Sequence, residues 1–163
     1  HLFLNSKPLW EQISEWQDKI AYIPQNIFLL DETIKQNITL ESNDKNINYE
    51  NLKKVINTSQ LEETINQLEY GLDTNVGDDG IRLSGGQRQR IILARALYHQ
   101  KEIIIFDEAT SSLDEATERS VMNDIYKFKG HKTIILISHK LDILHKCDKI
   151  LNLNNGELKL NKT

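Results

Sequence analysis

The sequence predicts an α/β fold in which helices cover a parallel β-sheet, and two observations carry that prediction. Residues 103–106 and 134–137 are apolar at every position, which is typical of strands covered on both faces of a parallel sheet. Stretches with helical spacing of apolar residues lie around these runs, and such alternation of strands and helices favours a parallel sheet.

The composition of the 163 residues is that of a globular domain. Hydrophobic residues make up 39% and charged residues 27%, so neither a disordered chain nor a membrane span is predicted. The net charge of −4 is mild and no dense run of Lys and Arg occurs, which argues against a nucleic-acid partner. The single Cys147 cannot form an internal disulfide, which fits a reducing compartment.

The first predicted elements are short. Residues 2–7 alternate weakly, like a strand, and residues 20–23 are a second strand that Pro24 stops. Between them, residues 10–19 have helical spacing. The apolar positions of this helix are expected to cover a core, and they are Trp10, Ile13 and Trp16.

The rest of the chain continues the alternation. Residues 44–70 predict two amphipathic helices of a small subdomain, residues 71–80 a loop rich in Gly and Asp, and a long helix follows Gly86. Four elements come next: a strand over 103–106, a helix over 117–126, a second fully buried strand over 133–137 and a short helix over 141–145. Asn154-Asn155-Gly156 then predicts a hairpin, as an antiparallel edge.

A small-residue segment at the start of the long helix favours phosphate binding. Ser84, Gly85, Gly86 and Gln87 lie where backbone N–H groups have no helical partner and, at the glycines, no side chain covers them. These groups and the helix dipole suit a phosphate. Ser84 could instead be a plain N-cap of the helix, and the residues alone leave both interpretations open.

Two acids follow the first apolar strand directly. In an open α/β sheet, ligands bind at the carboxyl ends of the strands, which is where Asp107 and Glu108 lie. Asp107 is placed to hold Mg²⁺, directly or through water, and Glu108 to polarise an attacking water. The alternative is that the two carboxylates cap the next helix.

Two more strands end in polar side chains. His139 follows the second apolar strand, so it points into the same crevice and could donate to a terminal phosphate. Gln25 follows the strand over 20–23 and offers a carbonyl for a metal and an amide for a water, although an ordinary turn is an equal alternative.

In this order and spacing, these segments resemble the motifs of ABC ATPases: the Q-loop, signature, Walker B, D-loop and switch histidine. The matching residues are Pro24-Gln25, 83–87, 103–108, 111–114 and His139, and nearly the whole chain is covered. The resemblance implies a P-loop NTPase fold of the ABC ATPase type with a small α-helical subdomain. The implied parts are 1–25 (the end of a β-rich segment and the Q-loop strand), 26–98 (the helical subdomain with the signature) and 99–163 (the catalytic core).

The resemblance also implies the site, with ATP and Mg²⁺ as cofactors. Asp107 would hold Mg²⁺, Glu108 would be the catalytic glutamate, and His139 would contact the γ-phosphate. Gln25 would contact the metal and the water. The signature residues would bind ATP held by the opposite subunit of a dimer, with Asp114 across the interface; they are Ser84, Gly85, Gly86 and Gln87.

Two further stretches resemble the exporter type. Residues 26–40 are similar to the exporter segment after the Q-loop, and 74–80 to the loop that contacts transmembrane coupling helices. The family more often has Glu and Arg at Asp78 and Asp79, and the second difference reverses a charge. The implied partners are a second ABC ATPase domain, in a homodimer, and a transmembrane domain at the cytoplasmic face of the inner membrane. The sequence does not select the cargo: lipid-linked saccharides, lipids, peptides and drugs all stay open, and a flippase of lipids or lipid-linked oligosaccharides is the preferred interpretation.

One motif of the family is absent from the sequence. A phosphate-binding loop needs G-x-x-x-x-G-K-[ST], and none of the seven glycines precedes Lys-Ser or Lys-Thr. We expect that loop before His1, and no ATP hydrolysis by these residues alone. A soluble ABC ATPase of DNA repair or translation and a regulatory nucleotide-binding module are the alternatives; Glu108 and His139 argue against the second.

Overall fold

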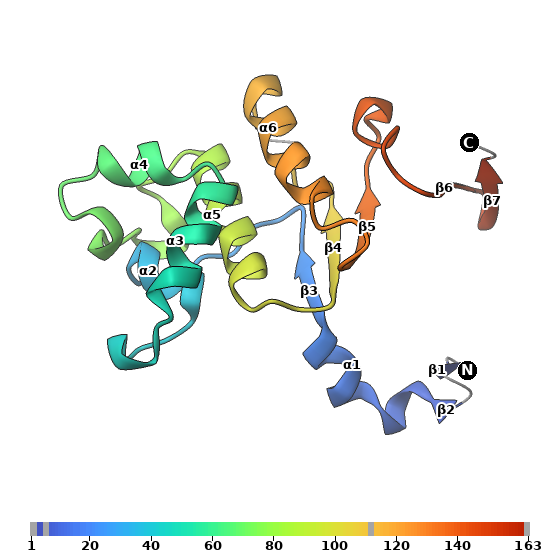
Figure 1. The fold of residues 1–163 in the computed structure, drawn as a ribbon, viewed down its shortest axis with the longest axis horizontal. Coiled ribbons are helices and arrows are strands. Elements are labelled where there is room, and N and C mark those ends of the chain that lie inside the picture. The colour runs from blue at the N-terminus through green and yellow to red at the C-terminus, as the bar shows by residue number, and fades with distance from the viewer. Residues whose placement is uncertain (1–2, 5–6, 111–112, 162–163) are drawn as a thin grey trace.

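The computed structural model describes residues 3–4, 7–110 and 113–161. The molecule is elongated (Figure 1). Helices gather at one end, a parallel sheet lies in the middle, and two small antiparallel strand pairs lie towards the other end, near both termini.

The parallel sheet has three strands in the spatial order β3-β4-β5. They are β3 (Ile20–Ile23), β4 (Ile103–Asp107) and β5 (Thr133–Ile137). Ile23 lies opposite Phe106, and Asp107 lies opposite Ile137. Because the strands run in the same direction, their carboxyl ends meet along one side of the sheet, here called the carboxyl edge. The predicted parallel sheet is confirmed.

Only one face of this sheet is covered by the described part of the chain. Helices α5 (Gly85–Tyr98) and α6 (Glu115–Tyr126) bury Ile104 and Phe106 on that face. On the other face Ile135 and Ile137 are 44% and 49% exposed. The expectation of strands covered on both faces is therefore wrong. Ile103 and Ile105 of β4 are only half-buried and β5 is not fully buried, because side chains alternate between the faces and only one face meets helices.

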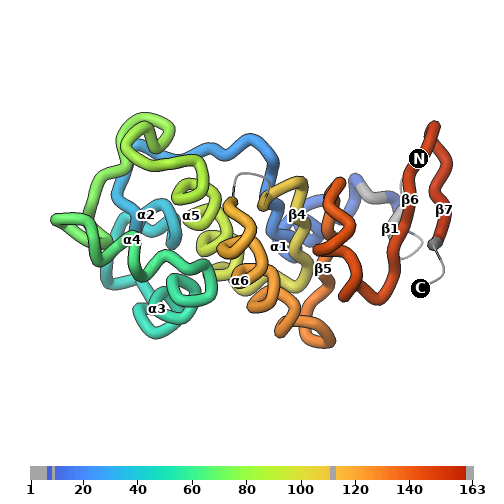
Figure 2. The backbone as a smooth tube through the Cα atoms, turned by 90° about the horizontal axis from the view of Figure 1, so that it is seen from above, coloured from blue at the N-terminus to red at the C-terminus, as the bar shows by residue number. Residues whose placement is uncertain are grey.

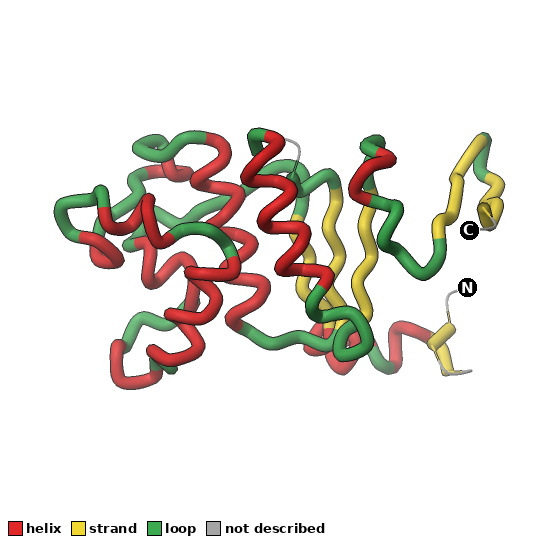
Figure 3. The backbone as a smooth tube through the Cα atoms, turned by 45° about the horizontal axis from the view of Figure 1, so that its top comes forward, coloured by secondary structure: helices red, strands yellow, loops and turns green. Residues whose placement is uncertain are grey.

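Three shorter helices gather beside α5 (Figures 2 and 3). They are α2 (Ile34–Thr39), α3 (Tyr49–Thr58) and α4 (Glu62–Asn66), joined by the short 3₁₀ turns Asp44–Asn46, Gly71–Asp73 and Asp78–Gly80. The two amphipathic helices predicted over 44–70 are α3 and α4. Leu52, Val55 and Leu61 are buried, as a core-facing apolar stripe requires.

Arg95 ties α5 to the segment that follows Gln25. Its Nε donates to the backbone oxygen of Asn37 at 2.6 Å and its Nη2 to Asn37 Oδ1 at 2.9 Å. Asn37 is fully buried, and its Oδ1 also accepts from the backbone N–H of Leu30 at 2.8 Å. The helix that begins beside Ser84 and the segment after Gln25 therefore form one hydrogen-bonded unit.

The N-terminal elements differ from expectation. They are β1 (Phe3–Leu4), β2 (Lys7–Pro8), a 3₁₀ turn (Leu9–Glu11) and α1 (Ile13–Lys19). Trp10 is 60% exposed, Ile13 is 48% exposed and Trp16 is half-buried, so the expectation that they cover a core is wrong. The reason is that α1 meets the described chain chiefly at the start of β3.

The C-terminal hairpin is formed as predicted, after a 3₁₀ turn over Leu141–Ile143. Strands β6 (Ile150–Asn154) and β7 (Glu157–Asn161) are joined by Asn155 and Gly156, whose φ angles are 50° and 80°. Two positive φ angles in a two-residue turn match the twist of the flanking strands. Within the described residues the hairpin pairs only with itself, so the antiparallel edge expected on the main sheet is wrong.

Among the described residues, no helix has the length and apolar character that crossing a bilayer requires.

Candidate functional site at the carboxyl edge

Glu108 is held by two side chains that come from the ends of the neighbouring strands. Gln25 Nε2 donates to Glu108 Oε2 at 2.8 Å, and His139 Nε2 lies 2.8 Å from Glu108 Oε1. Gln25 follows β3 and His139 follows β5, so the parallel order β3-β4-β5 puts both next to the end of β4. Three of the predicted site residues thus meet on one carboxylate.

The backbone of Glu108 turns sharply at the end of β4. Its φ angle is 50°, in the left-handed region that residues other than glycine rarely adopt. Its N–H donates to the backbone oxygen of Ile137 at 3.0 Å, which extends the pairing with β5 by one residue. A strained backbone held by its neighbours is typical of functional sites, and here it sets the position of the carboxylate.

Glu108 and His139, which contact each other, differ in how far their side chains are exposed to solvent. The Glu108 side chain is 24% exposed, whereas that of His139 is 94% exposed and faces solvent beyond the edge. Glu108 is therefore fixed by the protein, while the imidazole can turn towards another partner without losing packing.

Asp107 has a separate partner. Tyr22 Oη donates to Asp107 Oδ2 at 2.7 Å, and this hydrogen bond to a carboxylate raises the pKa of Tyr22. No described residue bonds both Asp107 and Glu108, so the two neighbouring acids are held independently. Sequence reasoning missed Tyr22; the signal available was a hydroxyl-bearing side chain on the strand beside Asp107.

The metal-binding capacity of the edge fits Mg²⁺ bound together with a nucleotide. No cluster of three or more His, Cys, Asp or Glu side chains suited to a metal is found in the described ranges. Mg²⁺ usually takes one or two carboxylates from the protein and completes its octahedron with phosphate oxygens and water. Asp107 provides one such carboxylate, with Oδ1 not bonded to any described residue.

The segment at the start of α5 forms a capping box. Ser84 Oγ accepts from the backbone N–H of Gln87 at 3.2 Å, and Gln87 Oε1 accepts from the backbone N–H of Ser84 at 2.8 Å. The N-cap interpretation of Ser84 is therefore realised. It does not exclude phosphate binding, because the backbone N–H groups of Gly85 and Gly86 make no hydrogen bond to a described residue.

Asp114 is the N-cap of α6. Its Oδ1 accepts from the backbone N–H of Thr117 at 3.0 Å, and hydrogen bonding from Thr117 lowers the pKa of the carboxyl. The alternative in which Asp107 and Glu108 cap this helix is thus wrong, since Asp114 has that position. Residues 111–112, which belong to the predicted D-loop, lie outside the described residues.

The predicted residues fall into three groups. Gln25, Asp107, Glu108 and His139 lie together at the carboxyl edge. The second group, Ser84 to Gln87, begins α5, and Asp114 by itself begins α6. No hydrogen bond or ion pair between described residues joins the second and third groups to the first.

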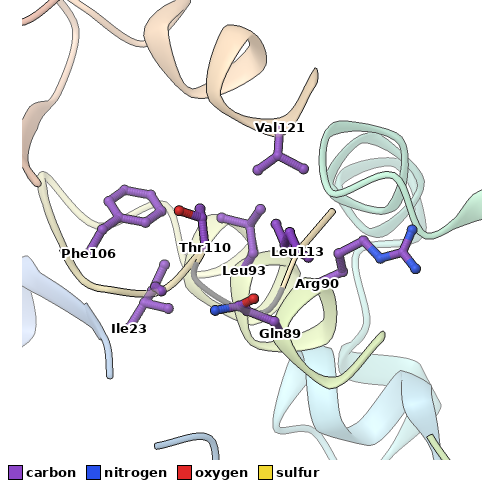
Figure 4. Close-up of a pocket in the computed structure, with 9 residues that line it drawn as sticks. Ile23, Gln89, Arg90, Leu93, Phe106, Thr110, Leu113 and Val121 are labelled. Carbon is purple, nitrogen blue, oxygen red and sulfur yellow. The ribbon is translucent and has the colours of Figure 1, made fainter. Parts of the chain in front are cut away.

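A small cavity behind the edge is too small to be the ligand site. Figure 4 shows Ile23 and Phe106 of the sheet facing Leu93 of α5 and Val121 of α6. The volume of the cavity is about 10 Å³, which is room for about one water. The cavity cannot hold a ligand larger than a water, so it is excluded as the ligand site.

Asp79, in the loop before α5, has a structural role. It is one of the positions at which the sequence departs from the exporter pattern. Its φ angle is 47°, which Asp tolerates better than most residues. Asp79 Oδ1 accepts from the backbone N–H of Leu29 at 3.3 Å, and its backbone oxygen accepts from Arg88 Nη1 at 3.3 Å. The loop is thereby bonded both to the segment after Gln25 and to α5.

Gly80, the next residue in this loop, packs closely against Leu29, and a substitution there tests this contact. Its φ angle is +69°, and an added Cβ would lie 2.8 Å from Leu29 Cδ1, which is buried. We expect Gly80→Ala to lower the free energy of unfolding by about 2 kcal/mol, from backbone strain plus the clash. Thermal unfolding measures it. Gly156→Ala is the matched control, because its φ angle is +80° with nothing within 4 Å, and about 1 kcal/mol is expected. Equal losses at both positions would contradict the close approach.

Comparisons with known proteins show which family the chain is similar to. The family described as ABC transporter matches residues 1–111. An ATP-dependent lipid A-core flippase of Pasteurella multocida is 38% identical over 148 residues, which cover 91% of this chain and 25% of the flippase. One of Alcanivorax borkumensis is 37% identical over 161 residues, covering 96% and 27%. The chain spans about a quarter of the length of the curated relatives it matches.

A solved structure shows the same fold. A bacterial Atm1-family ABC exporter with ATP bound matches with a TM-score of 0.83 and 32% identity, over 90% of this chain and 25% of that chain. The likeness includes most of the described elements, so the predicted fold class, an incomplete P-loop ATPase fold with a helical subdomain, is confirmed.

Proposed function

The chain belongs to the ABC transporter family, and we propose that it is the larger part of an ATP-hydrolysing domain that powers an exporter. The observation that carries the proposal is the carboxylate of Glu108, held by Gln25 and His139 next to Asp107. In the experiments below, 'the whole protein' means the full polypeptide that contains these 163 residues.

The proposed chemistry is the hydrolysis of ATP by an attacking water. Bound ATP with Mg²⁺ supplies the phosphoryl group and the charge neutralisation that its transfer needs. Glu108 orients the water and accepts its proton, which is the task of a general base. His139, which is largely exposed, donates to the terminal phosphate, and Gln25 contacts the water and the metal. Asp107 holds the metal.

The proposed assembly is a homodimer that holds ATP between two such domains. The backbone N–H groups of Gly85 and Gly86 and the hydroxyl of Ser84 bind the phosphates of ATP on the opposite subunit, with Gln87 fixing Ser84. Asp114 lies at the dimer interface. The separation of these groups from the carboxyl edge supports this, because in one subunit they make no contact with Glu108.

The proposed partner is a transmembrane domain, which places the ATPase at the cytoplasmic face of a membrane. The relatives named lipid A-core flippases support a lipid with a saccharide headgroup as the cargo. The loop 74–80 is proposed to contact the coupling helices. The segment 26–40 is proposed as the exporter segment after the Q-loop, and the parts 1–25, 26–98 and 99–163 are proposed as the functional division of the chain.

The experiment is ATP hydrolysis by the whole protein in liposomes. We expect Mg²⁺-dependent turnover that rises when lipids with saccharide headgroups are included, and transfer of a labelled glycolipid between leaflets that requires ATP. Turnover without any dependence on membrane or lipid would instead favour a soluble ABC ATPase, and no turnover would overturn the proposal.

The purified chain of residues 1–163 gives a second, separate prediction. It contains no G-x-x-x-x-G-K-[ST] segment, so most of the positioning of the phosphates is absent. We expect no ATP binding by calorimetry and no phosphate release above buffer. Mg²⁺-dependent phosphate release by this chain, removed by Glu108→Gln, would contradict the expectation.

A further inference from the structure

Tyr22 and Asp107 are diagonal neighbours on the open face of the sheet. Tyr22 of β3 lies opposite Ile105 of β4, and Asp107 is two residues further along β4. Side chains two residues apart on a strand point to the same face, and a diagonal neighbour is within reach of a long aromatic side chain. A β-branched residue at position 22 would be too short, and Phe would lack the donor.

The hydroxyl restrains one oxygen of the acid and leaves the other available. Tyr22 Oη donates to Asp107 Oδ2 at 2.7 Å, and no described residue bonds Oδ1. The donor is a neutral hydroxyl, so it places no positive charge beside Asp107 that would repel a bound cation, as Lys or Arg would. A carboxylate with one oxygen fixed by a neutral donor and one oxygen free is suited to hold a divalent cation.

The restraint is independent of the network around Glu108. Gln25 and His139 take both oxygens of Glu108 and make no hydrogen bond to Asp107. Removing the Tyr22 hydroxyl therefore changes the hold on Asp107 and leaves the carboxylate of Glu108 in place.

We propose that Tyr22 is a positioning residue that orients Asp107 towards a divalent cation through the Oη–Oδ2 hydrogen bond. The proposal rests on the proposed ATPase function. It predicts that loss of the hydroxyl weakens metal binding, with little effect once the metal is saturating.

The test uses Mn²⁺ as the probe in the whole protein carrying Glu108→Gln, so that ATP is retained rather than hydrolysed. Retention of radiolabelled ATP is measured against free Mn²⁺. We expect Tyr22→Phe to raise the half-saturating Mn²⁺ concentration about tenfold, in the range seen when the partner of a metal ligand is removed. Without Glu108→Gln, turnover of Tyr22→Phe at saturating Mg²⁺ should stay within about twofold of the unmodified protein.

Tyr49→Phe is the matched control, because Tyr49 is 51% exposed and lies in the helical region, and no shift in the half-saturating Mn²⁺ concentration is expected. Tyr22→Leu, which also lacks the hydroxyl, should reproduce the shift of Tyr22→Phe. Since Tyr22 is 55% exposed, both variants should fold, with melting temperatures within about 2 °C of Tyr49→Phe.

Two results would count against the proposal and can be told apart. If the protein with Tyr22 intact retains ATP but Tyr22→Phe shifts the Mn²⁺ dependence by less than twofold, the role of Tyr22 is overturned and the ATPase function stands. If the protein retains no ATP at any Mn²⁺ concentration and shows no turnover, the ATPase function and the role of Tyr22 both fall.

Discussion

Glu108→Gln in the whole protein is expected to lower the rate of ATP hydrolysis about 10²- to 10⁴-fold, the usual contribution of a general base. The amide has the same shape as the carboxylate and keeps one oxygen that can accept from Gln25 or His139. It cannot accept a proton from water. The effect should therefore fall on the chemical step and leave nucleotide binding intact.

The measurement is phosphate release together with retention of radiolabelled ATP. We expect the variant to hold ATP in a dimer that forms but does not turn over, visible by size-exclusion chromatography as a species that ADP does not produce. Glu102→Gln is the matched control, since Glu102 is an exposed acid just before the start of the same strand. Its turnover should be unchanged. Turnover of Glu108→Gln within tenfold of the unmodified protein would favour a regulatory module.

The residues of this site could be predicted because each lies at or just after the end of a strand. Pro24 after β3, Asp107 and Glu108 at the end of β4 and Ser138-His139 after β5 mark three strand ends, and parallel strands bring their carboxyl ends together. The sequence does not predict that Gln25 and His139 both contact Glu108. That convergence depends on the φ angle of 50° at Glu108 and on side-chain rotamers, which no spacing of residues encodes.

Two further features cannot be read from the apolar pattern of the sequence: the register in which the strands pair, and what covers each face of the sheet. The contact of Tyr22 with Asp107 requires Tyr22 to lie opposite Ile105, and an apolar run has no information on which residues pair. An apolar run also does not say what covers it. The runs over 103–106 and 134–137 are equally apolar, yet the sheet meets helices on one face only. On the other face, Ile135 and Ile137 of the edge strand β5 are half-exposed.

The segment that follows β5 is fastened to α6, and this is where the largest effect on stability is expected. Lys140 Nζ lies 2.9 Å and 2.8 Å from the two carboxylate oxygens of Glu118, which is 5% exposed. Tyr126 Oη donates to the backbone oxygen of Ile143, and Lys146 Nζ donates to Asn123 Oδ1 at 2.8 Å. Lys140 is the residue after His139, so this ion pair holds the backbone next to that side chain.

Lys140→Met is expected to lower the free energy of opening of this region by about 3 kcal/mol. The variant leaves the buried carboxylate of Glu118 without its cation, and breaking such a pair typically costs about 3–5 kcal/mol. The lower end applies because the Lys140 side chain is 47% exposed and water can reach the site. Hydrogen–deuterium exchange of peptides from α6 and β5 in the whole protein measures the change.

Two further variants separate an unpaired buried charge from a general loss of packing. Lys129→Met removes an exposed pair, since Lys129 and Asp148 are 50% and 73% exposed, and less than about 1 kcal/mol is expected. Adding Glu118→Leu to Lys140→Met removes the stranded charge, so protection from exchange should largely return. If the double variant is as unprotected as Lys140→Met, the stability of this segment comes from the lysine stem and not from the ion pair. The backbone that carries His139 would then be positioned by packing of the Lys140 stem and not by its charge.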